Sequence, residues 1–185
     1  MGFHTFDVER AERLEDPDRY RWVSAEELID AVDPAGDDVV ADLGSGTGFY
    51  TDDVAPHVGS VYAVDLQPEM HEFYREKGTP GHVEFVESDV ADLPLEDDTL
   101  DAAFSTMTYH EFASDDAIDE LARVLRSGAR LIVFDWSGDG DGEAGPPVEE
   151  RFSVDDAIVA LDAAGFDVVS ATTRTETFEL VALAP

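Results

Sequence analysis

The stretch from Val39 to Phe49 places the strongest constraint on the fold of this chain. An apolar run ends at Leu43 and is followed by glycines at every second position, Gly44, Gly46 and Gly48. An apolar run that stops at glycines is typical of a buried strand that ends in a tight turn. The next residues, Tyr50 to His57, have helical spacing. The stretch therefore predicts a strand–turn–helix unit. Open α/β sheets bind ligands at such turns, because glycine lets the backbone approach and the helix start offers free N–H groups.

Apolar segments of strand length alternate with amphipathic segments along the rest of the chain. The predicted strands are residues 39–43, Val61–Asp65, His82–Val86, Leu100–Ser105, Ala129–Phe134, Phe166–Thr173 and Thr177–Leu183. The predicted helices between them are Tyr50–His57, Pro68–Lys77, Ser114–Leu125 and Ser153–Ala164. This order favours the α/β class, with a doubly wound, mostly parallel seven-stranded sheet and an antiparallel C-terminal hairpin.

The chain is predicted to form one domain behind an amino-terminal extension. Residues 1–34 form a predicted helical extension that Pro17 interrupts, and Ser24 with Glu27 has the spacing of a capping box. Residues 35–185 form the predicted domain, since no linker or repeat divides them. Within it, Ser137–Pro147 is expected to be a flexible acidic loop. It lacks the ligand series and distal glutamate of a calcium-binding EF-hand, and no metal is expected.

The charge of the chain is extreme. It carries 44 acidic and 11 basic residues, a formal net charge of −33, and the acids are spread over every segment. Such a balance is known from halophiles, and at 1 M salt repulsion between charges is screened within about 3 Å. We therefore expect a high-salt cytoplasm. The charge also argues against nucleic-acid binding and against an anionic membrane surface, because no basic patch is present to neutralise phosphates.

Two absences narrow the class of protein further. No apolar run approaches the roughly 18 residues of a membrane helix, so no membrane insertion is expected. The 185 residues contain no cysteine, which excludes disulfides, thiolate nucleophiles and thiolate metal sites. With no secretory signal pattern at the start, the cytoplasm is the expected compartment.

Glycine spacing and three acids bear on which ligand the turn holds. A nicotinamide fingerprint, G-x-G-x-x-G, would place its third glycine where Phe49 stands. Asp65 ends the second strand, where a carboxylate can accept hydrogen bonds from ribose hydroxyls. Asp89 follows the third strand and is placed to accept from the exocyclic amine of adenine. Asp42 is a poor neighbour for a pyrophosphate. It is acceptable beside a cation, or else ties down the turn as a structural residue.

Taken in order, four segments resemble the successive motifs of the class I S-adenosylmethionine-dependent methyltransferases. They are VADLGSGTG, VYAVD, ESDVADLPLEDDTLDAAF and RVLRSGARLIV. The resemblance covers about residues 35–183. It implies a Rossmann-like methyltransferase fold, S-adenosylmethionine as the cofactor, and enzymatic transfer of a methyl group.

The resemblance also implies which residues bind the cofactor. The backbone from Gly44 to Gly48 would hold its methionine portion, and Asp65 would bind the ribose. Leu66 and Val90 would flank the adenine, and Asp89 would meet its amine. The expected set is completed by Asp42, Ser45, Tyr50 and Ser105, with helix packing as the alternative for Tyr50.

The segment from Thr106 to Phe112 follows the fourth strand, where a methyl acceptor would lie. His110 is the predicted general base or substrate ligand, because the unperturbed pKa of histidine lies near neutrality. Its alternative is an ordinary loop histidine. Glu111 is the candidate to orient His110, and Tyr109 is expected to line a substrate pocket or the core.

Two further segments, RLEDPDRYRWVSAEELI and GPPVEERF, resemble the branch that contains the ubiquinone/menaquinone-biosynthesis C-methyltransferases. In that branch the amino-terminal helices and the late loop cover the acceptor. This implies that Arg21, Trp22 and Arg151 face substrate. For Arg151 the alternative is a salt bridge with Glu149 or Glu150.

Several methyltransferase subclasses do not fit the sequence. Amide and exocyclic-amine methyltransferases carry an Asn/Asp-Pro-Pro-Tyr loop after the fourth strand, whereas Ser105–Thr108 contains no proline. Cysteine-dependent cytosine and arsenite methylation need the missing thiols. The sequence favours transfer to a small-molecule acceptor by in-line displacement, in a monomer or homodimer. A nicotinamide-dependent oxidoreductase and a non-catalytic S-adenosylmethionine-binding sensor or partner subunit stay open as alternatives.

The net charge generates a first prediction. Raising KCl from a low to a molar concentration should raise the melting temperature, because screening weakens repulsion among acids that folding brings together. Thermal unfolding followed by circular dichroism measures the effect. A melting temperature that stays constant or falls with KCl contradicts the expected salt adaptation.

Overall fold

The computed structural model describes residues 6–185, so residues 1–5 of the predicted extension lie outside the described residues. Its strands are β1 (Val39–Leu43), β2 (Ser60–Asp65), β3 (Val83–Glu87), β4 (Leu100–Thr106), β5 (Leu125–Trp136), β6 (Asp167–Thr173) and β7 (Thr177–Leu183). Its α-helices are α1 (Ala25–Val32), α2 (Thr51–Val54), α3 (Pro68–Lys77), α4 (Tyr109–Phe112), α5 (Asp115–Val124) and α6 (Val154–Ala163). Its 3₁₀ helices are η1 (Val8–Glu15), η2 (Pro17–Arg21), η3 (Ala55–His57) and η4 (Val148–Glu150).

The seven strands form one mixed sheet in the order β3-β2-β1-β4-β5-β7-β6. The strands β1 to β5 pair in parallel. The last strand, β7, pairs antiparallel with both β5 and β6. The predicted doubly wound α/β class with its antiparallel C-terminal hairpin is therefore confirmed.

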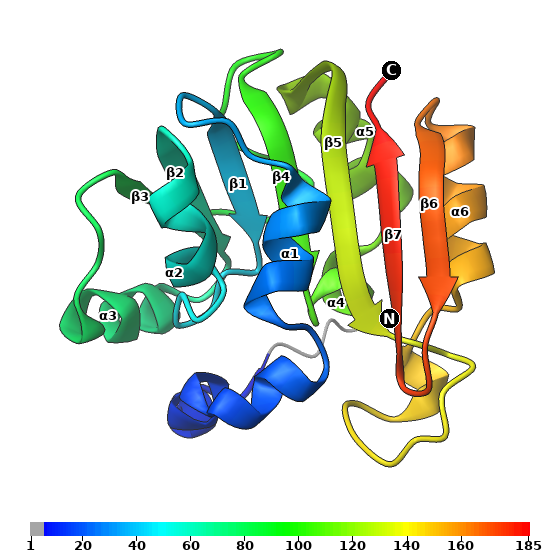
Figure 1. Cartoon of the computed structure of the whole chain (residues 1–185), viewed down its shortest axis with the longest axis horizontal. Helices are drawn as coiled ribbons and strands as arrows, with labels where there is room; N and C mark the ends of the chain where they lie inside the picture. Colours follow the sequence, from blue (N-terminus) through cyan, green and yellow to red (C-terminus); the bar gives the residue numbers. More distant parts are fainter. Residues whose placement is uncertain (1–5) are drawn as a thin grey trace.

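Helices cover both faces of the sheet and create two apolar cores (Figure 1). On one face α1, α2 and α3 contribute buried residues such as Leu28 and Tyr74. On the other face α4, α5 and α6 contribute residues such as Leu121. A strand that is covered on both faces needs apolar residues at successive positions, which is why β1 is mostly apolar and β5 is continuously apolar from Leu131 to Phe134. None of the helices within residues 6–185 has the length and apolar character needed to cross a bilayer.

The central strands place the site. β1 and β4 lie side by side, and the chain winds outward from β1 to β2 and β3 but from β4 to β5 on the other side. The loops that leave these two strands diverge at the carboxyl edge, which is the position at which doubly wound folds bind their ligands. The glycine turn follows β1 and the segment with His110 follows β4. Both predicted sites therefore lie at the same edge.

The amino-terminal extension lies at this carboxyl edge before it enters the domain as α1 (Figure 1). α1 begins with the predicted capping box, in which Ser24 and Glu27 bond reciprocally. Residues before Ser24 differ from the predicted helix and form η1 and η2 instead. Asp7 and Asp16 each cap a new 3₁₀ segment, and Pro17 prevents the first from continuing.

Two elements differ in length from the prediction. The helix expected over Tyr50–His57 is a single α-helical turn, α2, followed by η3, because Pro56 lacks the N–H that a continuing α-helix needs. The strand β5 starts at Leu125 rather than at the predicted Ala129. The turn expected at Ser127–Gly128 is instead a kink within this strand, with Gly128 at a φ of +79°.

A buried histidine lies between α3 and the outer strands. His71 is 2% exposed, and its ring centre lies 4.8 Å from that of Phe85. Its Nε2 has no hydrogen-bond partner among the described residues. Burial and the charge of Arg75 lower the pKa of His71 to about 4, although a hydrogen bond with the backbone of Ala63 opposes them. The folded protein therefore holds this side chain as neutral imidazole.

His71 generates a prediction about acid stability. Its folded-state pKa lies below the unfolded value, so its contribution to stability is complete above about pH 6.5 and is lost as the pH falls toward about 4. We expect His71→Leu to reduce the acid-induced loss of unfolding free energy by roughly 2 kcal/mol between about pH 6.5 and 4.5, as measured by urea titration. The same substitution at His57, which is exposed on η3, is the control. Equal acid slopes for the wild type and His71→Leu would refute this assignment.

Candidate functional site

The turn after β1 is built from glycines in the left-handed conformation. Gly44, Gly46 and Gly48 have φ values of +77°, +52° and +78°, where a side chain is strained. The neighbouring space is also filled. A Cβ on Gly44 would overlap the side chain of Thr108, and one on Gly48 would lie 2.2 Å from the ring of Tyr74. Glycine is therefore required here both by backbone conformation and by packing.

Asp65 joins the end of β2 to this turn. Its Oδ2 accepts a hydrogen bond from the N–H of Gly46 at 2.8 Å, and its Oδ1 accepts one from the N–H of Gln67 at 2.8 Å. The N–H of Ser45 donates to the carbonyl of Val64, the residue before Asp65. Burial raises the pKa of Asp65, although the hydrogen bonds from Gln67 and Gly46 favour its charged form. The structure thus brings together the glycines and the acid that were predicted as one site.

The residues predicted to contact adenine follow β2 and β3. These strands pair with Asp65 opposite Glu87, so the residues after them lie at neighbouring strand ends. Leu66 is 52% exposed and Val90 is buried. Asp89 is exposed, and its Oδ1 accepts from a backbone N–H in its own turn at 3.0 Å. An apolar surface with a carboxylate at its rim fits a flat purine that carries an exocyclic amine.

Unpaired polar atoms gather at the ends of β1 and β4. Asp42 is 1% exposed, and its Oδ2 accepts from the hydroxyl of Thr51 at 2.6 Å. Burial raises the pKa of Asp42 to about 7. Its Oδ1 and the buried hydroxyls of Ser45 and Ser105 have no hydrogen-bond partner among the described residues. Buried polar groups are nearly always paired, so these atoms fit a site that a polar ligand and its waters complete.

The extension packs over the glycine turn. Glu15 at the end of η1 accepts a hydrogen bond from the hydroxyl of Thr47. The same carboxylate pairs with Lys77 at 3.2 Å, and Lys77 pairs with Asp52 at 2.8 Å. Lys77 is the single lysine of the sequence. It joins the extension to α2 and α3 beside the predicted cofactor site.

Tyr50 belongs to the contact between the turn and the extension. Its side chain is buried, and its hydroxyl lies 3.1 Å from the carbonyl of Val23 and 3.2 Å from that of Arg19. The guanidinium of Arg19 lies 4.9 Å from the centre of its ring. These contacts match the packing alternative for Tyr50.

A histidine–carboxylate pair lies at the ends of β4 and β5. The Nδ1 of His110 is 2.9 Å from Oδ1 and 3.0 Å from Oδ2 of Asp135, and the backbone N–H of His110 donates to Oδ2 at 2.6 Å. Asp135 is completely buried. A carboxylate against Nδ1 favours the tautomer with its proton on that nitrogen, which leaves Nε2 as a proton acceptor. The arrangement is that of an oriented general base.

Sequence reasoning offered Glu111 as a candidate to orient His110, or as simply one more acid, and missed Asp135. The Oε1 of Glu111 lies 4.0 Å from Nε2 of His110, beyond hydrogen-bond distance. A signal for Asp135 was present in the sequence. This acid ends the apolar run LIVFD, just as Asp65 ends VYAVD, and both strands end at the ligand-binding edge.

The pKa of His110 results from opposed effects. Burial lowers it, but the hydrogen bond and charge of Asp135, with smaller contributions from Glu111 and Glu150, raise it above the ordinary 6.5. Burial raises the pKa of Glu111 to about 7, while His110 opposes that shift. His110 therefore gains a proton more readily than a free histidine, and Glu111 titrates in the neutral range.

Tyr109 faces the core. It is 1% exposed, and its ring packs against those of Phe112, Phe152 and Phe178, with centres 5.6 to 6.5 Å apart. Of the two expectations for Tyr109, the core position describes it and the substrate pocket does not.

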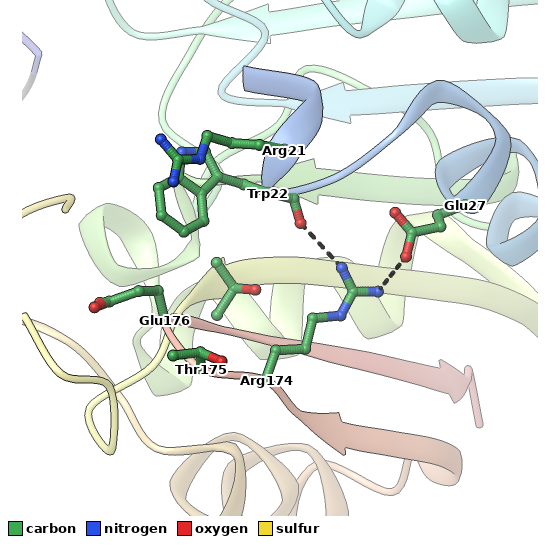
Figure 2. A pocket seen from close by; sticks show the side chains of 7 residues that line it. Arg21, Trp22, Glu27, Arg174, Thr175 and Glu176 are labelled. Atoms are coloured by element: carbon green, nitrogen blue, oxygen red, sulfur yellow. Dashed lines mark hydrogen bonds and ion pairs between the residues drawn. The ribbon is translucent and has the colours of Figure 1, made fainter. Parts of the chain in front are cut away.

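Trp22 lines a cavity of about 260 Å³ between the extension and the turn that joins β6 to β7 (Figure 2). Its ring centre lies 5.1 Å from that of Trp136 at the end of β5. Trp136 directly follows Asp135, so this cavity lies at the strand end that carries the His110–Asp135 pair. Of the three residues expected to face substrate, Arg21 and Trp22 line this cavity.

The third, Arg151, does not line this cavity but anchors the acidic loop. Its side chain is 1% exposed and pairs with Glu176 at 3.1 Å. Its guanidinium also donates to loop carbonyls, among them that of Pro146 at 2.9 Å. The alternative prediction that Arg151 forms a salt bridge is thus confirmed. Its predicted partner is wrong, because the carboxylate belongs to Glu176 and to neither Glu149 nor Glu150. These bonds hold the loop that was expected to be flexible.

Comparison with known proteins supports the assignment of this edge. A methyltransferase-domain family matches the chain over residues 41–133, about half its length. The crystal structure of a SAM (S-adenosylmethionine) dependent methyltransferase from Aquifex aeolicus is 30% identical, with a TM-score of 0.89 over 98% of this chain and 100% of that one. A demethylmenaquinone methyltransferase from Clavibacter sepedonicus is 33% identical over 58% of this chain and 44% of its own length. An arsenite methyltransferase from Halobacterium salinarum is 31% identical over 78% of this chain and 41% of its own length.

The chain spans less than half the length of these two curated relatives. The matched family segment nevertheless begins in β1 and ends in β5, so it contains the glycine turn, Asp65 and His110. The Aquifex likeness extends over the whole of both chains. The chain therefore belongs to the S-adenosylmethionine-dependent methyltransferase family.

Proposed function

We propose that this chain transfers a methyl group from S-adenosylmethionine to a small-molecule acceptor from which His110 removes a proton. One observation carries the proposal. His110 lies at the carboxyl edge of the sheet, with its Nδ1 held by buried Asp135. When bound, S-adenosylmethionine supplies an activated methyl group, whose bond to sulfur breaks in line as the bond to the acceptor forms and whose electron pair stays on sulfur.

The rest of the chemistry falls to the chain. The proton of the acceptor passes to Nε2 of His110 while the acceptor forms its new bond to the methyl carbon. Asp135 then stabilises the imidazolium without itself taking the proton. The side chains of His110 and Asp135 are 10% and 0% exposed, which limits competing proton exchange with water. In its ionised form Glu111, whose pKa burial raises to about 7, adds a further negative charge near the imidazolium.

The cofactor roles are assigned to the residues that meet at the glycine turn. Asp65 receives the ribose hydroxyls, Leu66 and Val90 bracket the adenine, and Asp89 accepts from its amine. The backbone from Gly44 to Gly48 holds the methionine portion. Asp42, Ser45 and Ser105 supply the unpaired polar atoms behind the turn, whereas Tyr50 supports the extension.

A small-molecule acceptor is supported by two relatives and by the size of the cavity. The names of the Clavibacter and Halobacterium relatives specify acceptors that are small molecules, and the first relative belongs to the menaquinone branch that the sequence resembles. Arsenite itself does not carry over, because thiol-based chemistry has no cysteine to use in these 185 residues. The net charge of −33 supports a protein that works in a high-salt cytoplasm.

Neither alternative raised by the sequence gains support. A nicotinamide oxidoreductase is opposed by the family match and by Phe49 at the third fingerprint position. A non-catalytic S-adenosylmethionine sensor has no use for a buried carboxylate that selects one tautomer of a histidine at the ligand edge. The catalytic proposal accounts for both observations.

The cofactor assignment predicts that Asp65→Ala weakens S-adenosylmethionine binding by tenfold or more, because hydrogen bonds to a charged group contribute about 1.5–3 kcal/mol each. Titration calorimetry in molar KCl measures the affinity, with NAD(H) titrated in parallel. Glu87→Ala, which removes the exposed acid opposite Asp65 at the end of β3, is the matched control. Unchanged affinity in Asp65→Ala removes the ribose assignment. Binding of NAD(H) without any binding of the sulfonium overturns the proposed function.

The base assignment predicts that His110→Gln lowers methyl transfer about 100-fold or more while cofactor binding persists. Asp135→Asn should lower the rate and also move the acid limb of the pH–rate profile to lower pH, because the carboxylate that raises the pKa of His110 is gone. Transfer is followed by mass spectrometry of metabolites methylated in cell extract. Full activity in His110→Gln, with cofactor affinity intact, rules out this histidine as the base.

A further inference from the structure

The open cavity beside Trp22 lies between two segments that are far apart in the sequence (Figure 2). One wall is the end of the extension, and the other is the turn from Arg174 to Thr177. Arg174 fastens the walls together, since it donates to the carbonyl of Trp22 at 3.0 Å and pairs with Glu27 at 3.0 Å. The cavity is therefore built by the fold.

Most charged groups that line this cavity are already paired. The pairs are Arg174 with Glu27 and Glu179, and Glu176 with Arg151. Arg21 is the exception. Among residues 6–185 it has no carboxylate within ion-pair distance, and its guanidinium lies 4.6 Å from the centre of the Trp22 ring. The lining thus offers one cation whose N–H donors are free for a ligand.

The cavity is also close to neutral within a strongly acidic chain. Among the lining residues, the guanidinium groups of Arg21 and Arg174 balance the carboxylates of Glu27 and Glu176. Most of the surface repels an anion, because the chain has a net charge of −33. An anionic group meets no local excess of negative charge here, and Arg21 presents the planar fork that suits a carboxylate.

Aromatic side chains and size restrict the rest of the ligand. Trp22 lines the cavity, and Trp136 packs behind it. An indole face favours a flat ring over a flexible chain. The volume of about 260 Å³ lies just below the range of roughly 300–1,000 Å³ that is typical of ligand pockets. A single-ring compound suits this space better than a long apolar chain.

We propose that this cavity is the acceptor site and that the acceptor is a small aromatic carboxylate. Its ring packs against Trp22 and its carboxylate pairs with Arg21. The assignment rests on the proposed methyl transfer and names its substrate class. It is supported by location at the carboxyl edge, because Trp136 pairs with Thr177 of the cavity wall and lies at the same end of β5 as Asp135, which holds His110. Anchoring the carboxylate at Arg21 leaves another ring substituent for deprotonation at His110.

Intrinsic fluorescence tests the site directly, because Trp22 and Trp136 are the two tryptophans of the sequence. The full chain is titrated with benzoate and with benzamide, which has the same shape but no charge. We expect benzoate to quench tryptophan emission saturably, with a half-saturation concentration about fivefold lower than that of benzamide. Arg21→Gln should weaken benzoate to the benzamide value and leave benzamide unchanged. Arg13→Gln, on η1 and outside the cavity, is the matched control.

Equal affinities for the two probes, or an Arg21→Gln variant that still prefers benzoate, would overturn the proposed site. Calorimetry with S-adenosylhomocysteine on the same samples separates this proposal from the proposed function. If the cofactor analogue binds but benzoate binding does not depend on Arg21, the proposed acceptor class is refuted and the proposed methyl transfer is not. Arg21-dependent benzoate binding without cofactor binding sinks the methyl transfer instead. Unchanged S-adenosylhomocysteine affinity in Arg21→Gln shows that the variant is folded.

Discussion

The site depends on the left-handed turn that ends β1. Gly48 lies against the ring of Tyr74, whose hydroxyl donates to Asp52 at 2.6 Å, so the turn is packed onto α3 and α2. Gly44 lies against Thr108, two residues before His110. A side chain on either glycine would displace these neighbours. The conformation of one short turn thus positions both the proposed cofactor site and the segment that carries His110, the proposed base.

Parallel pairing of β4 with β5 then assembles the His110–Asp135 pair, the proposed base. The register places Thr106 opposite Phe134, so the residues just beyond these two positions meet at the carboxyl edge. His110 arrives on the single turn of α4, and Asp135 arrives one residue after Phe134. Neither residue needs a specialised loop, because the sheet itself aligns them. This explains why a compact domain with few long loops carries a complete histidine–carboxylate pair.

Periodicity and glycine punctuation were sufficient to predict the fold, since strands covered on both faces have continuous apolar sequences and the terminal strands are close enough to pair. The site was predicted less completely. Asp65 and the glycines are neighbours in a known strand–turn–helix unit, and their proximity follows from the strand order. Asp135 lies 25 residues from His110 and meets it through strand register, which no local pattern reports. Likewise, Arg151 met Glu176 across the fold, whereas the sequence pointed to adjacent acids.

The burial of a few ion pairs has a consequence for how charge is used in this protein. In a solvent of about 1 M salt, attraction and repulsion between exposed groups decay over about 3 Å, whereas pairs excluded from water are screened much less. The exposed acids then form a hydrated surface layer, in which the position of any one carboxylate matters little. The charged groups whose exact positions matter are those that solvent hardly reaches. They form the pairs Arg151–Glu176 and His110–Asp135. Surface acids therefore tolerate substitution with little effect, whereas these four residues do not, because each must meet its partner at a fixed position.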